Sequence, residues 1–301
     1  MKRFIRNVGL FFIAFSVLIG VLFLLINGLI KNDNTKFILE SKIDKIFTGD
    51  SHIRHSINDS LIRDSKNVAL SSEGFIYSYS KIDYLVRNNP QIHTVYLGVS
   101  YHSFSDYYDH YIYKEPIALL FYYYLPIFEQ FKILMKVENP VSFLVRSSVK
   151  GIDSIFRYSD KNHCLGSFQN YKTDVKVSLE SINKRIKEQY YLNKKARPFS
   201  EEQLYYFNKI ITYCNENNIC LVIVNTPLYE LYKESVPEKF RNKYYLMIDD
   251  NNLNIIDFNN LKLEKIDFLP DGDHVSAKGA NLTTLYLNEI INKSSQKLLE
   301  E

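Results

Sequence analysis

The stretch KIFTGDSH, residues 45–52, combines a short apolar run, a glycine turn and a reactive side chain. Ile46 and Phe47 are apolar at consecutive positions, which is typical of a strand that is covered on both faces. Gly49 then lets the chain turn, so that Ser51 follows the carboxyl end of this strand. Loops after parallel strands gather at one edge of a sheet, where α/β folds bind their ligands. The stretch therefore predicts a strand over residues 45–48 and places the Ser51 hydroxyl at that edge.

Four further short runs resemble the first in being rich in β-branched and aromatic residues. They cover residues 67–70, 94–98, 220–225 and 254–258. Helical patterns lie between them, as at residues 200–217, where Ser200 and Gln203 form the pattern of a capping box. Strands that alternate with helices predict an α/β fold with a parallel sheet.

A second polar motif, Asp271-Gly272-Asp273-His274, lies near the other end of the chain. Asp271 and His274 stand just before a helical pattern for which Ser276 is the expected N-cap. A serine hydroxyl is a poor nucleophile unless a histidine takes its proton and a carboxylate orients that histidine. The two motifs together therefore predict a catalytic triad of Ser51, His274 and Asp271.

Interpretations without chemistry remain open for both motifs. Gly49, Asp50 and Ser51 fit a turn in which the aspartate or the serine caps the next helix. His274 fits a loop histidine that hydrogen-bonds only to backbone. These interpretations explain each motif alone but not the presence of both in one chain, so the catalytic interpretation is preferred.

With these residues the chain resembles the SGNH/GDSL hydrolase superfamily, whose first block carries the nucleophile as Gly-Asp-Ser and whose last block is Asp-x-x-His. The resemblance implies a three-layer, flavodoxin-like parallel sheet. It also implies that Ser51 is the nucleophile, His274 the general base and Asp271 the carboxylate that orients it. The family's oxyanion hole is made of the nucleophile's amide, a glycine of a second block and an asparagine of a third block.

The second and third blocks match the family less closely. The second block would be residues 70–74, with Gly74 as the glycine, and the third would begin at Gly98 with Ser100 in place of the asparagine. The resemblance thus implies an oxyanion hole of Ser51, Gly74 and Ser100. Either Ser100 donates a weaker hydrogen bond than asparagine would, or the activity is altered or lost.

Three further polar side chains stand near the expected edge of the sheet. They are His52, His102 and Thr226, and we expect them to be candidate substrate contacts. For the two histidines the alternative is a surface position without a role.

Residues 8–30 form an apolar segment that follows Lys2, Arg3 and Arg6. About 20 such residues span a bilayer as a helix. Basic residues before a span stay in the cytoplasm, so the sequence predicts a single-pass protein with a cytoplasmic N-terminus and an extracytoplasmic main domain. The alternative is a cleaved signal peptide, but the segment is long for one and no Ala-x-Ala pattern closes it.

The pattern along the chain predicts three parts. They are a basic tip with a transmembrane signal anchor over residues 1–31, a linker over residues 32–44, and an SGNH-like domain over residues 45–301. A helical insertion of about residues 104–198, rich in tyrosine, interrupts this domain. We expect the insertion to be a helical subdomain with an aromatic core. The alternative is a wall over Ser51 whose tyrosines stack on sugars or touch the membrane.

Composition limits the classes of function. The 301 residues carry a formal net charge of +3, which is too small to favour a nucleic-acid partner. Cys164, Cys214 and Cys220 lack a paired C-x-x-C spacing, so neither a zinc site nor a disulfide framework is indicated. Triad chemistry needs no metal and no cofactor, and we expect none.

The resemblance and the anchor together predict a function. We expect serine-dependent removal or transfer of an O-acyl group, acetyl in the first place, on an exported carbohydrate or cell-envelope polymer. The altered third block leaves an alternative, a non-catalytic SGNH-like binding or scaffold protein in envelope polysaccharide assembly. The sequence predicts no particular protein partner.

Overall fold

The chain folds into two compact units. The computed structural model describes residues 1–32, 34–113, 117–156, 165–171, 173, 175–258 and 261–300. One unit, here called the anchor unit, comprises residues 1–36 and 118–163, and the other, the α/β unit, comprises residues 37–117 and 164–301. The middle of the expected insertion therefore belongs to the anchor unit, and its two flanks belong to the α/β unit.

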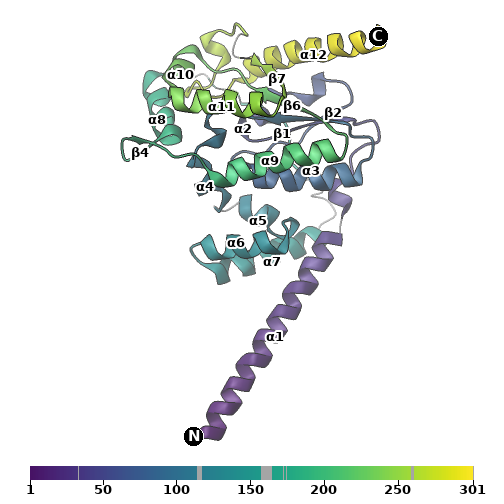
Figure 1. The fold of residues 1–301 in the computed structure, drawn as a ribbon, viewed down its shortest axis with the longest axis vertical. Helices are drawn as coiled ribbons and strands as arrows, with labels where there is room; N and C mark the ends of the chain where they lie inside the picture. Colours follow the sequence, from purple (N-terminus) through teal and green to yellow (C-terminus); the bar gives the residue numbers. More distant parts are fainter. Residues whose placement is uncertain are drawn as a thin grey trace. The chain divides into compact units, whose positions relative to one another are not determined.

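A five-stranded parallel sheet forms the centre of the α/β unit (Figure 1). The strands are β1 (Lys45–Thr48), β2 (Ser65–Asn67), β3 (Thr94–Gly98), β6 (Cys220–Asn225) and β7 (Asn254–Asp257). Their order is β2-β1-β3-β6-β7, and all neighbouring strands are parallel. Counted along the chain this is 2-1-3-4-5, the flavodoxin-like order, whose switch point lies between β1 and β3. The predicted α/β fold with a parallel sheet is confirmed.

The second strand differs from its prediction. The apolar run over residues 67–70 predicted it, whereas β2 ends at Asn67. The chain beyond still follows β1, because the Val68 amide donates to the Phe47 carbonyl at 2.8 Å. Regular pairing stops there since the Asn67 side chain accepts from the Ala69 amide at 3.0 Å. The residues of β2 are polar and the apolar run follows them. A prediction from hydrophobic residues therefore places this strand too far along the chain.

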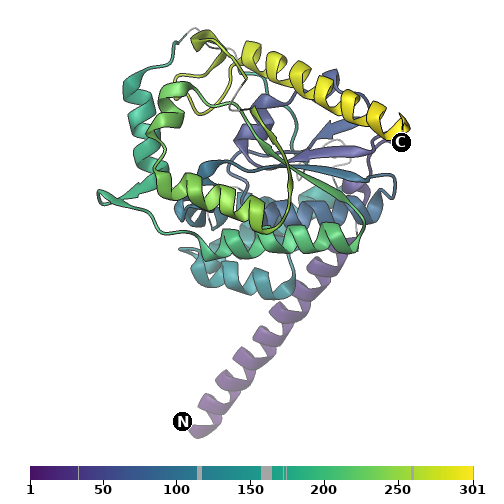
Figure 2. The same ribbon diagram turned by 45° about the horizontal axis from the view of Figure 1, so that its top comes forward.

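Helices cover both faces of the sheet (Figures 1 and 2). On one face α3 (Phe75–Asn88) packs beside α9 (Glu201–Glu216), and on the other α2 (Ser51–Ser56) packs beside α12 (Ala277–Glu300). The remaining helices of this unit are α4 (Tyr107–Ile112), α8 (Leu179–Tyr190), α10 (Glu230–Ser235) and α11 (Glu238–Asp250), and a small hairpin pairs β4 (Tyr191–Leu192) with β5 (Lys195–Ala196).

The core between the sheet and α2 with α12 is aromatic and aliphatic. Phe47, Ile53, Val224 and Leu287 are fully buried there. The rings of Phe47 and Tyr96 stack with their centroids 4.6 Å apart. Each such side chain contributes roughly 1.5–3 kcal/mol by leaving water, so this core fixes α2 and α12 on the sheet.

Two predicted helix starts are observed, with one change. Ser200 caps α9 by accepting from the Gln203 amide at 3.0 Å, and Ser276 precedes α12 and accepts from the Gly279 amide at 3.4 Å. The Gln203 side chain does not complete the capping box by accepting from the Ser200 amide. It accepts from the Phe75 amide at 2.8 Å instead, and this hydrogen bond links α9 to the start of α3.

The anchor unit contains α1 (Lys2–Asn32), α6 (Ile127–Lys136) and α7 (Pro140–Phe156), and α5 (Ile117–Phe121) leads into it. Helix α1 is long enough and apolar enough over Lys2–Lys31 to cross a membrane. Its apolar side chains are largely exposed, as those of a helix with a lipid environment would be.

A buried ion pair holds the loop after β2. Lys81 Nζ lies 2.5 Å from Glu73 Oε2, and both side chains are fully buried. Glu73 also accepts from the Leu70 amide at 3.1 Å and the Ser78 hydroxyl at 2.8 Å, and Lys81 donates to the Val68 carbonyl at 2.5 Å. Burial raises the pKa of Glu73, and the attraction of Lys81 offsets part of this rise. The pair therefore fixes residues 70–74 at the carboxyl edge of the sheet.

We expect Lys81→Met to lower the free energy of unfolding by about 3–5 kcal/mol, because it leaves a carboxylate buried without its cation. The double variant Glu73→Gln/Lys81→Met should recover a large part of that loss. Urea unfolding of the full chain in detergent micelles measures both. Equal losses in the single and double variants would show that packing, not charge pairing, governs this position.

Candidate active site

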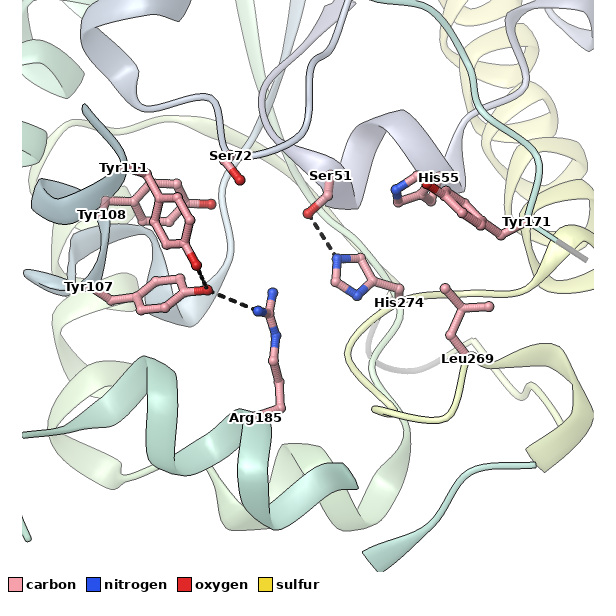
Figure 3. Close-up of a pocket in the computed structure, with 10 residues that line it drawn as sticks. All are labelled: Ser51, His55, Ser72, Tyr107, Tyr108, Tyr111, Tyr171, Arg185, Leu269 and His274. Atoms are coloured by element: carbon pink, nitrogen blue, oxygen red, sulfur yellow. Dashed lines mark hydrogen bonds between the residues drawn. The ribbon is translucent and has the colours of Figure 1, made fainter. Parts of the chain in front are cut away.

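The two polar motifs of the sequence meet at the carboxyl edge of the sheet. The Ser51 hydroxyl lies 2.8 Å from Nε2 of His274, although the two residues are 223 positions apart (Figure 3). Nδ1 of His274 lies 2.8 Å from Oδ2 of Asp271. The structure thus brings the three predicted residues together in the order hydroxyl, imidazole, carboxylate. This order lets Nδ1 donate to the carboxylate and leaves Nε2 to accept from the serine.

The turn that carries Ser51 requires a glycine. Gly49 has a φ of +132°, and a Cβ there would lie 3.2 Å from the Cα of Gly98 in the neighbouring strand. Asp50 then caps α2 by accepting from the His52 amide at 2.9 Å. The capping role proposed as an alternative is therefore real, and it coexists with the contact between Ser51 and His274.

A closed loop carries the other two residues. Phe268 and Val275 form an antiparallel bridge, and the Leu269 amide donates to the His274 carbonyl at 2.8 Å. At the tip, Oδ1 of Asp271 accepts from the amide of His274 at 3.2 Å. Burial raises the pKa of Asp271, but the electrostatic attraction of the His274 ring and the hydrogen bond from it outweigh this and hold the pKa below its usual value. Asp271 thus orients the imidazole and shapes the loop that holds it.

A second contact joins the same two motifs. Nε2 of His52 lies 2.9 Å from Asp273, and Nδ1 lies 3.1 Å from Asp50. Burial lowers the pKa of His52, but these two carboxylates raise it to about 10, so the ring is an imidazolium at neutral pH. This ring stacks on His274 with centroids 4.6 Å apart. His52 therefore supports the predicted base from behind.

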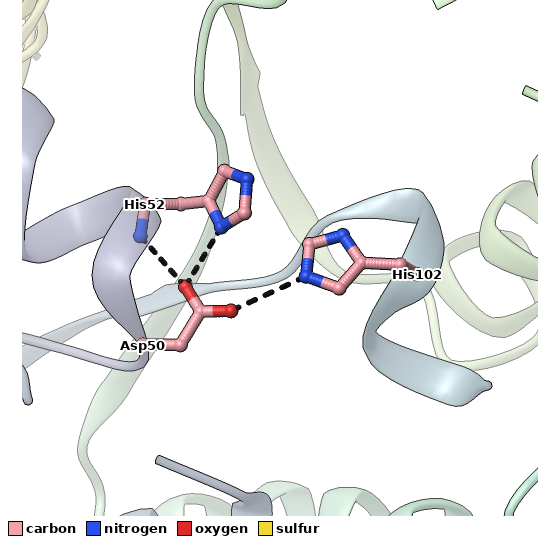
Figure 4. A group of neighbouring side chains, drawn as sticks. All are labelled: Asp50, His52 and His102. Atoms are coloured by element: carbon pink, nitrogen blue, oxygen red, sulfur yellow. Dashed lines mark hydrogen bonds and ion pairs between the residues drawn. The ribbon is translucent and has the colours of Figure 1, made fainter. Parts of the chain in front are cut away.

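Both carboxylates beside His52 have further partners. Asp50 lies between His52 and His102, with Oδ2 3.5 Å from Nε2 of His102 (Figure 4). It also accepts from the Tyr108 hydroxyl. Burial tends to raise the pKa of Asp50, yet the charge of His52 and the hydrogen bonds from both histidines hold it well below its usual range. Burial also lowers the pKa of His102, which favours its neutral form.

Asp273 is held in the same way on the other side. Its Oδ2 accepts from Nε of Arg185 at 2.7 Å and from the Gln189 amide group at 2.8 Å. Burial tends to raise its pKa, but His52 and Arg185 hold it well below its usual range. The network therefore pairs two carboxylates, Asp50 and Asp273, with two cations, His52 and Arg185.

A pocket of about 250 Å³ lies beside the triad (Figure 3). It is lined by Ser51, His55, Ser72, Tyr107, Tyr108, Tyr111, Tyr171, Arg185, Leu269 and His274. The guanidinium of Arg185 points into the same space as the Ser51 hydroxyl and donates to the Tyr107 hydroxyl at 2.9 Å. The Tyr107 and Tyr111 hydroxyls lie 3.0 Å apart.

The tyrosines of the expected insertion separate into two sets. Tyr107, Tyr108 and Tyr111 lie on α4 and wall the pocket. The run of residues 122–124 is buried within the anchor unit. The alternatives of a pocket wall and an aromatic core therefore each describe a different part of the insertion.

His55 lines the pocket and was not singled out in the sequence. Its Nδ1 donates to the Gln169 carbonyl at 3.0 Å, and burial lowers its pKa to about 4, so the ring is neutral. It meets the His274 ring edge-on, with centroids 5.6 Å apart. The available signal was its position four residues after Ser51, which places both side chains on one face of a helix.

The predicted oxyanion residues do not all reach the pocket. Gly74 caps α3 beside Gln203, and Ser100 is buried with its amide donating to the Ser103 hydroxyl at 2.9 Å. Neither is among the residues that line the pocket. The residue of the second block that does so is Ser72, whose φ of +62° turns the loop toward Ser51.

The three candidate substrate contacts are likewise buried and lie outside the pocket lining. His52 and His102 use their ring nitrogens within the network around Asp50. Thr226 follows β6 and is 1% exposed. None of these three side chains can contact a ligand in the pocket, because other side chains form the pocket surface.

Two groups of described residues bring possible metal ligands within 4.8 Å of one another. They are Asp50 with His52 and His102, and His52 with Asp273 and His274. Both include His52. A histidine ligand must present an unprotonated nitrogen, whereas each nitrogen of His52 faces a carboxylate that favours its proton. The arrangement fits a charge-paired imidazolium better than a metal centre.

Comparison with known protein families and with curated proteins finds no match to this chain. The chemistry of the site is therefore inferred from its own residues.

We expect the stabilising effect of His52 to depend on pH. Its pKa is raised in the folded chain, so its contribution is complete below about pH 6.5 and is lost as the pH rises toward 10. Replacement by glutamine should therefore lower Tm by about 5–15 °C at pH 6 and by clearly less at pH 9.5. Thermal unfolding of both proteins across this range measures the difference, and His110→Gln, at an exposed position of α4, is the control. A pH-independent difference would mean that His52 is neutral.

Proposed function

We propose that this chain is a membrane-anchored, SGNH-like serine enzyme that removes or transfers an O-acyl group, acetyl in the first place, on an exported carbohydrate or cell-envelope polymer. One observation carries the proposal. The Ser51 hydroxyl lies 2.8 Å from an imidazole that a carboxylate orients from the other side, and this set opens onto a pocket. A hydroxyl in that position has a base to take its proton as it attacks.

The proposed reaction proceeds through an acyl-enzyme. Ser51 Oγ attacks the carbonyl carbon of the ester while Nε2 of His274 takes its proton, and Asp271 stabilises the imidazolium. The bond to the sugar oxygen then breaks, and His274 returns the proton to that oxygen. Water or an acceptor hydroxyl next attacks the acyl group, gives its proton to His274 and releases Ser51.

The negative charge on the attacked oxygen needs preorganised donors, each of which contributes on the order of 3 kcal/mol in other serine enzymes. We assign this role to the amides of Ser51 and Ser72. Ser72 takes the place first given to Gly74, because it is the second-block residue that lines the pocket. The proposed oxyanion hole does not use the serine at the third-block position, since Ser100 lies outside the pocket lining.

The pocket wall supports a carbohydrate substrate. Aromatic faces stack on the apolar faces of sugar rings, and phenol groups with a guanidinium bond to sugar hydroxyls. Tyr107, Tyr111 and Arg185 supply these groups next to Ser51. A volume of about 250 Å³ accommodates an acyl group and the ring that bears it, not a long acyl chain.

Helix α1 supports the proposed placement at a membrane. Lys2, Arg3 and Arg6 precede its apolar run, so the N-terminus would face the cytoplasm and the α/β unit would lie outside. Exported polymers would be within reach of the site at that location.

Removal and transfer share one acyl-enzyme and differ in the group that resolves it. Product analysis with an added oligosaccharide acceptor separates them, because transfer yields acylated acceptor without free acetate. A non-catalytic, polysaccharide-binding protein with this fold is the second candidate. The departure from the family's third block favours it, and the contact between Ser51 and His274 opposes it.

We expect the full chain to react with a fluorophosphonate probe and to hydrolyse a small aryl acetate, since both need an activated serine. Ser51→Ala should abolish labelling and lower turnover by at least about 10³-fold. Thermal unfolding should change little, because the substitution removes one part-exposed hydroxyl. Undiminished turnover by Ser51→Ala would overturn the proposed nucleophile, and a native chain without any labelling would favour the non-catalytic candidate.

The carbohydrate assignment has a separate test at the pocket wall. We expect Tyr111→Ala to raise KM for O-acetylated xylo-oligosaccharides by about 5–10-fold, since an aromatic contact of this kind contributes about 1 kcal/mol. Turnover of the aryl acetate should stay unchanged. His110→Ala, one residue away on α4 and outside the pocket lining, is the matched control. Equal losses of activity on both substrates would mean that Tyr111 maintains the structure of the site and does not bind the sugar.

A further inference from the structure

The hairpin of α6 and α7 in the anchor unit exposes large apolar side chains. On α6, Phe128 is 76% exposed and Met135 is 87% exposed, and Phe131 between them is also exposed. Spacings of three and four residues place these side chains on one face of the helix. Soluble proteins rarely leave a stripe of this kind without a partner.

Helix α7 carries three separate stripes. Phe143, Ser147 and Gly151 face the interior of the anchor unit. One exposed stripe is apolar and consists of Val141, Val145, Val149 and Ile152, and the other is polar and consists of Ser142, Arg146, Lys150 and Asp153. An apolar and a polar stripe side by side are typical of a helix that lies in a membrane interface, with one stripe toward acyl chains and the other toward water.

The hairpin packs against the last turns of α1. The Phe23 ring lies 6.5 Å from Phe131, and Gln130 Nε2 donates to the Asn27 side chain at 2.7 Å. A Cβ on Gly151 would lie 2.2 Å from Ile30, so α7 approaches α1 as closely as a glycine permits. The exposed stripes of the hairpin therefore belong to the same compact unit as the apolar surface of α1.

The length of α1 indicates the depth in a bilayer at which the hairpin contacts it. The apolar helix covers 30 residues, or about 45 Å, whereas a bilayer core is about 30 Å thick. Basic residues hold its first turns at one membrane surface. With Lys2, Arg3 and Arg6 at that surface, the roughly 20 residues that cross the core end near residue 26. The contacts of the hairpin with Phe23, Asn27 and Ile30 therefore lie where the core meets the opposite headgroups.

We infer that the α6–α7 hairpin lies in the headgroup region of the bilayer that α1 spans, with its apolar stripes among the upper acyl carbons. Lipid is the occupant because the hairpin is fixed to the helix end that reaches this depth. The hairpin and α1 then form one membrane-bound element with two modes of attachment, one across the bilayer and one along its surface.

The chain contains no tryptophan, so single substitutions introduce a unique fluorophore. We expect Met135→Trp and Val141→Trp, in the full chain reconstituted into phosphatidylcholine vesicles, to lose at least half of their emission to lipids brominated near the headgroup. Phe12→Trp in the middle of α1 should be quenched best by lipids brominated near the chain ends. Ser142→Trp, adjacent to Val141 but on the polar stripe, is the matched control and should be quenched less than half as much.

Two results would overturn the inference. In the first, the tryptophan emission of Met135→Trp and Val141→Trp is not quenched although that of Phe12→Trp is. This result would place the hairpin away from lipid. The other is equal quenching at residues 141 and 142. If unquenched tryptophans were accompanied by blue-shifted emission that disappeared on dilution of the protein, the apolar stripes would be covered by a second copy of the chain instead. No activity enters these measurements, so their outcome is independent of the proposed chemistry.

Discussion

The contact between the His52 imidazolium and Asp273 is the interaction on which the site depends. Ser51 and His52 are adjacent in one motif, and Asp273 and His274 are adjacent in the other, so two neighbouring contacts join the two segments. The contact between Ser51 and His274 alone would be a single hydrogen bond at a part-exposed position. The buried ion pair beside it has no access to water, and removing one partner of such a pair costs about 3–5 kcal/mol. It therefore fixes the geometry of Ser51 and His274 that the proposed chemistry requires.

The fold was predictable to the extent that burial leaves a pattern in the sequence. Strands β1, β3 and β6 are buried on both faces, and their apolar runs mark their bounds. The second strand is polar, and its apolar run lies beyond it, so its position was missed. Helix starts at Ser200 and Ser276 were found because a cap is a local feature that neighbouring residues encode.

The contacts among Ser51, His274 and Asp271 were predictable because these residue types in this order carry a chemical meaning. The supporting groups were not, since Arg185 and Gln189 reach Asp273 from a helix about 85 residues away, a distance that no local pattern reports. Ser72 shows a related difficulty. Its positive φ would ordinarily indicate a glycine, and the nearby Gly74 attracted the assignment instead. The insertion likewise gave no sign in the sequence that its middle joins α1 while its flanks wall the pocket.

The separation of the two motifs along the chain determines when the site can exist. His274 is synthesised 223 residues after Ser51, and domains fold as units once their segments are available. A nascent chain that has not yet reached the second motif carries the serine without its histidine partner. Translation must therefore pass the second motif before the contact between Ser51 and His274 can form, and a product truncated ahead of that motif would lack it.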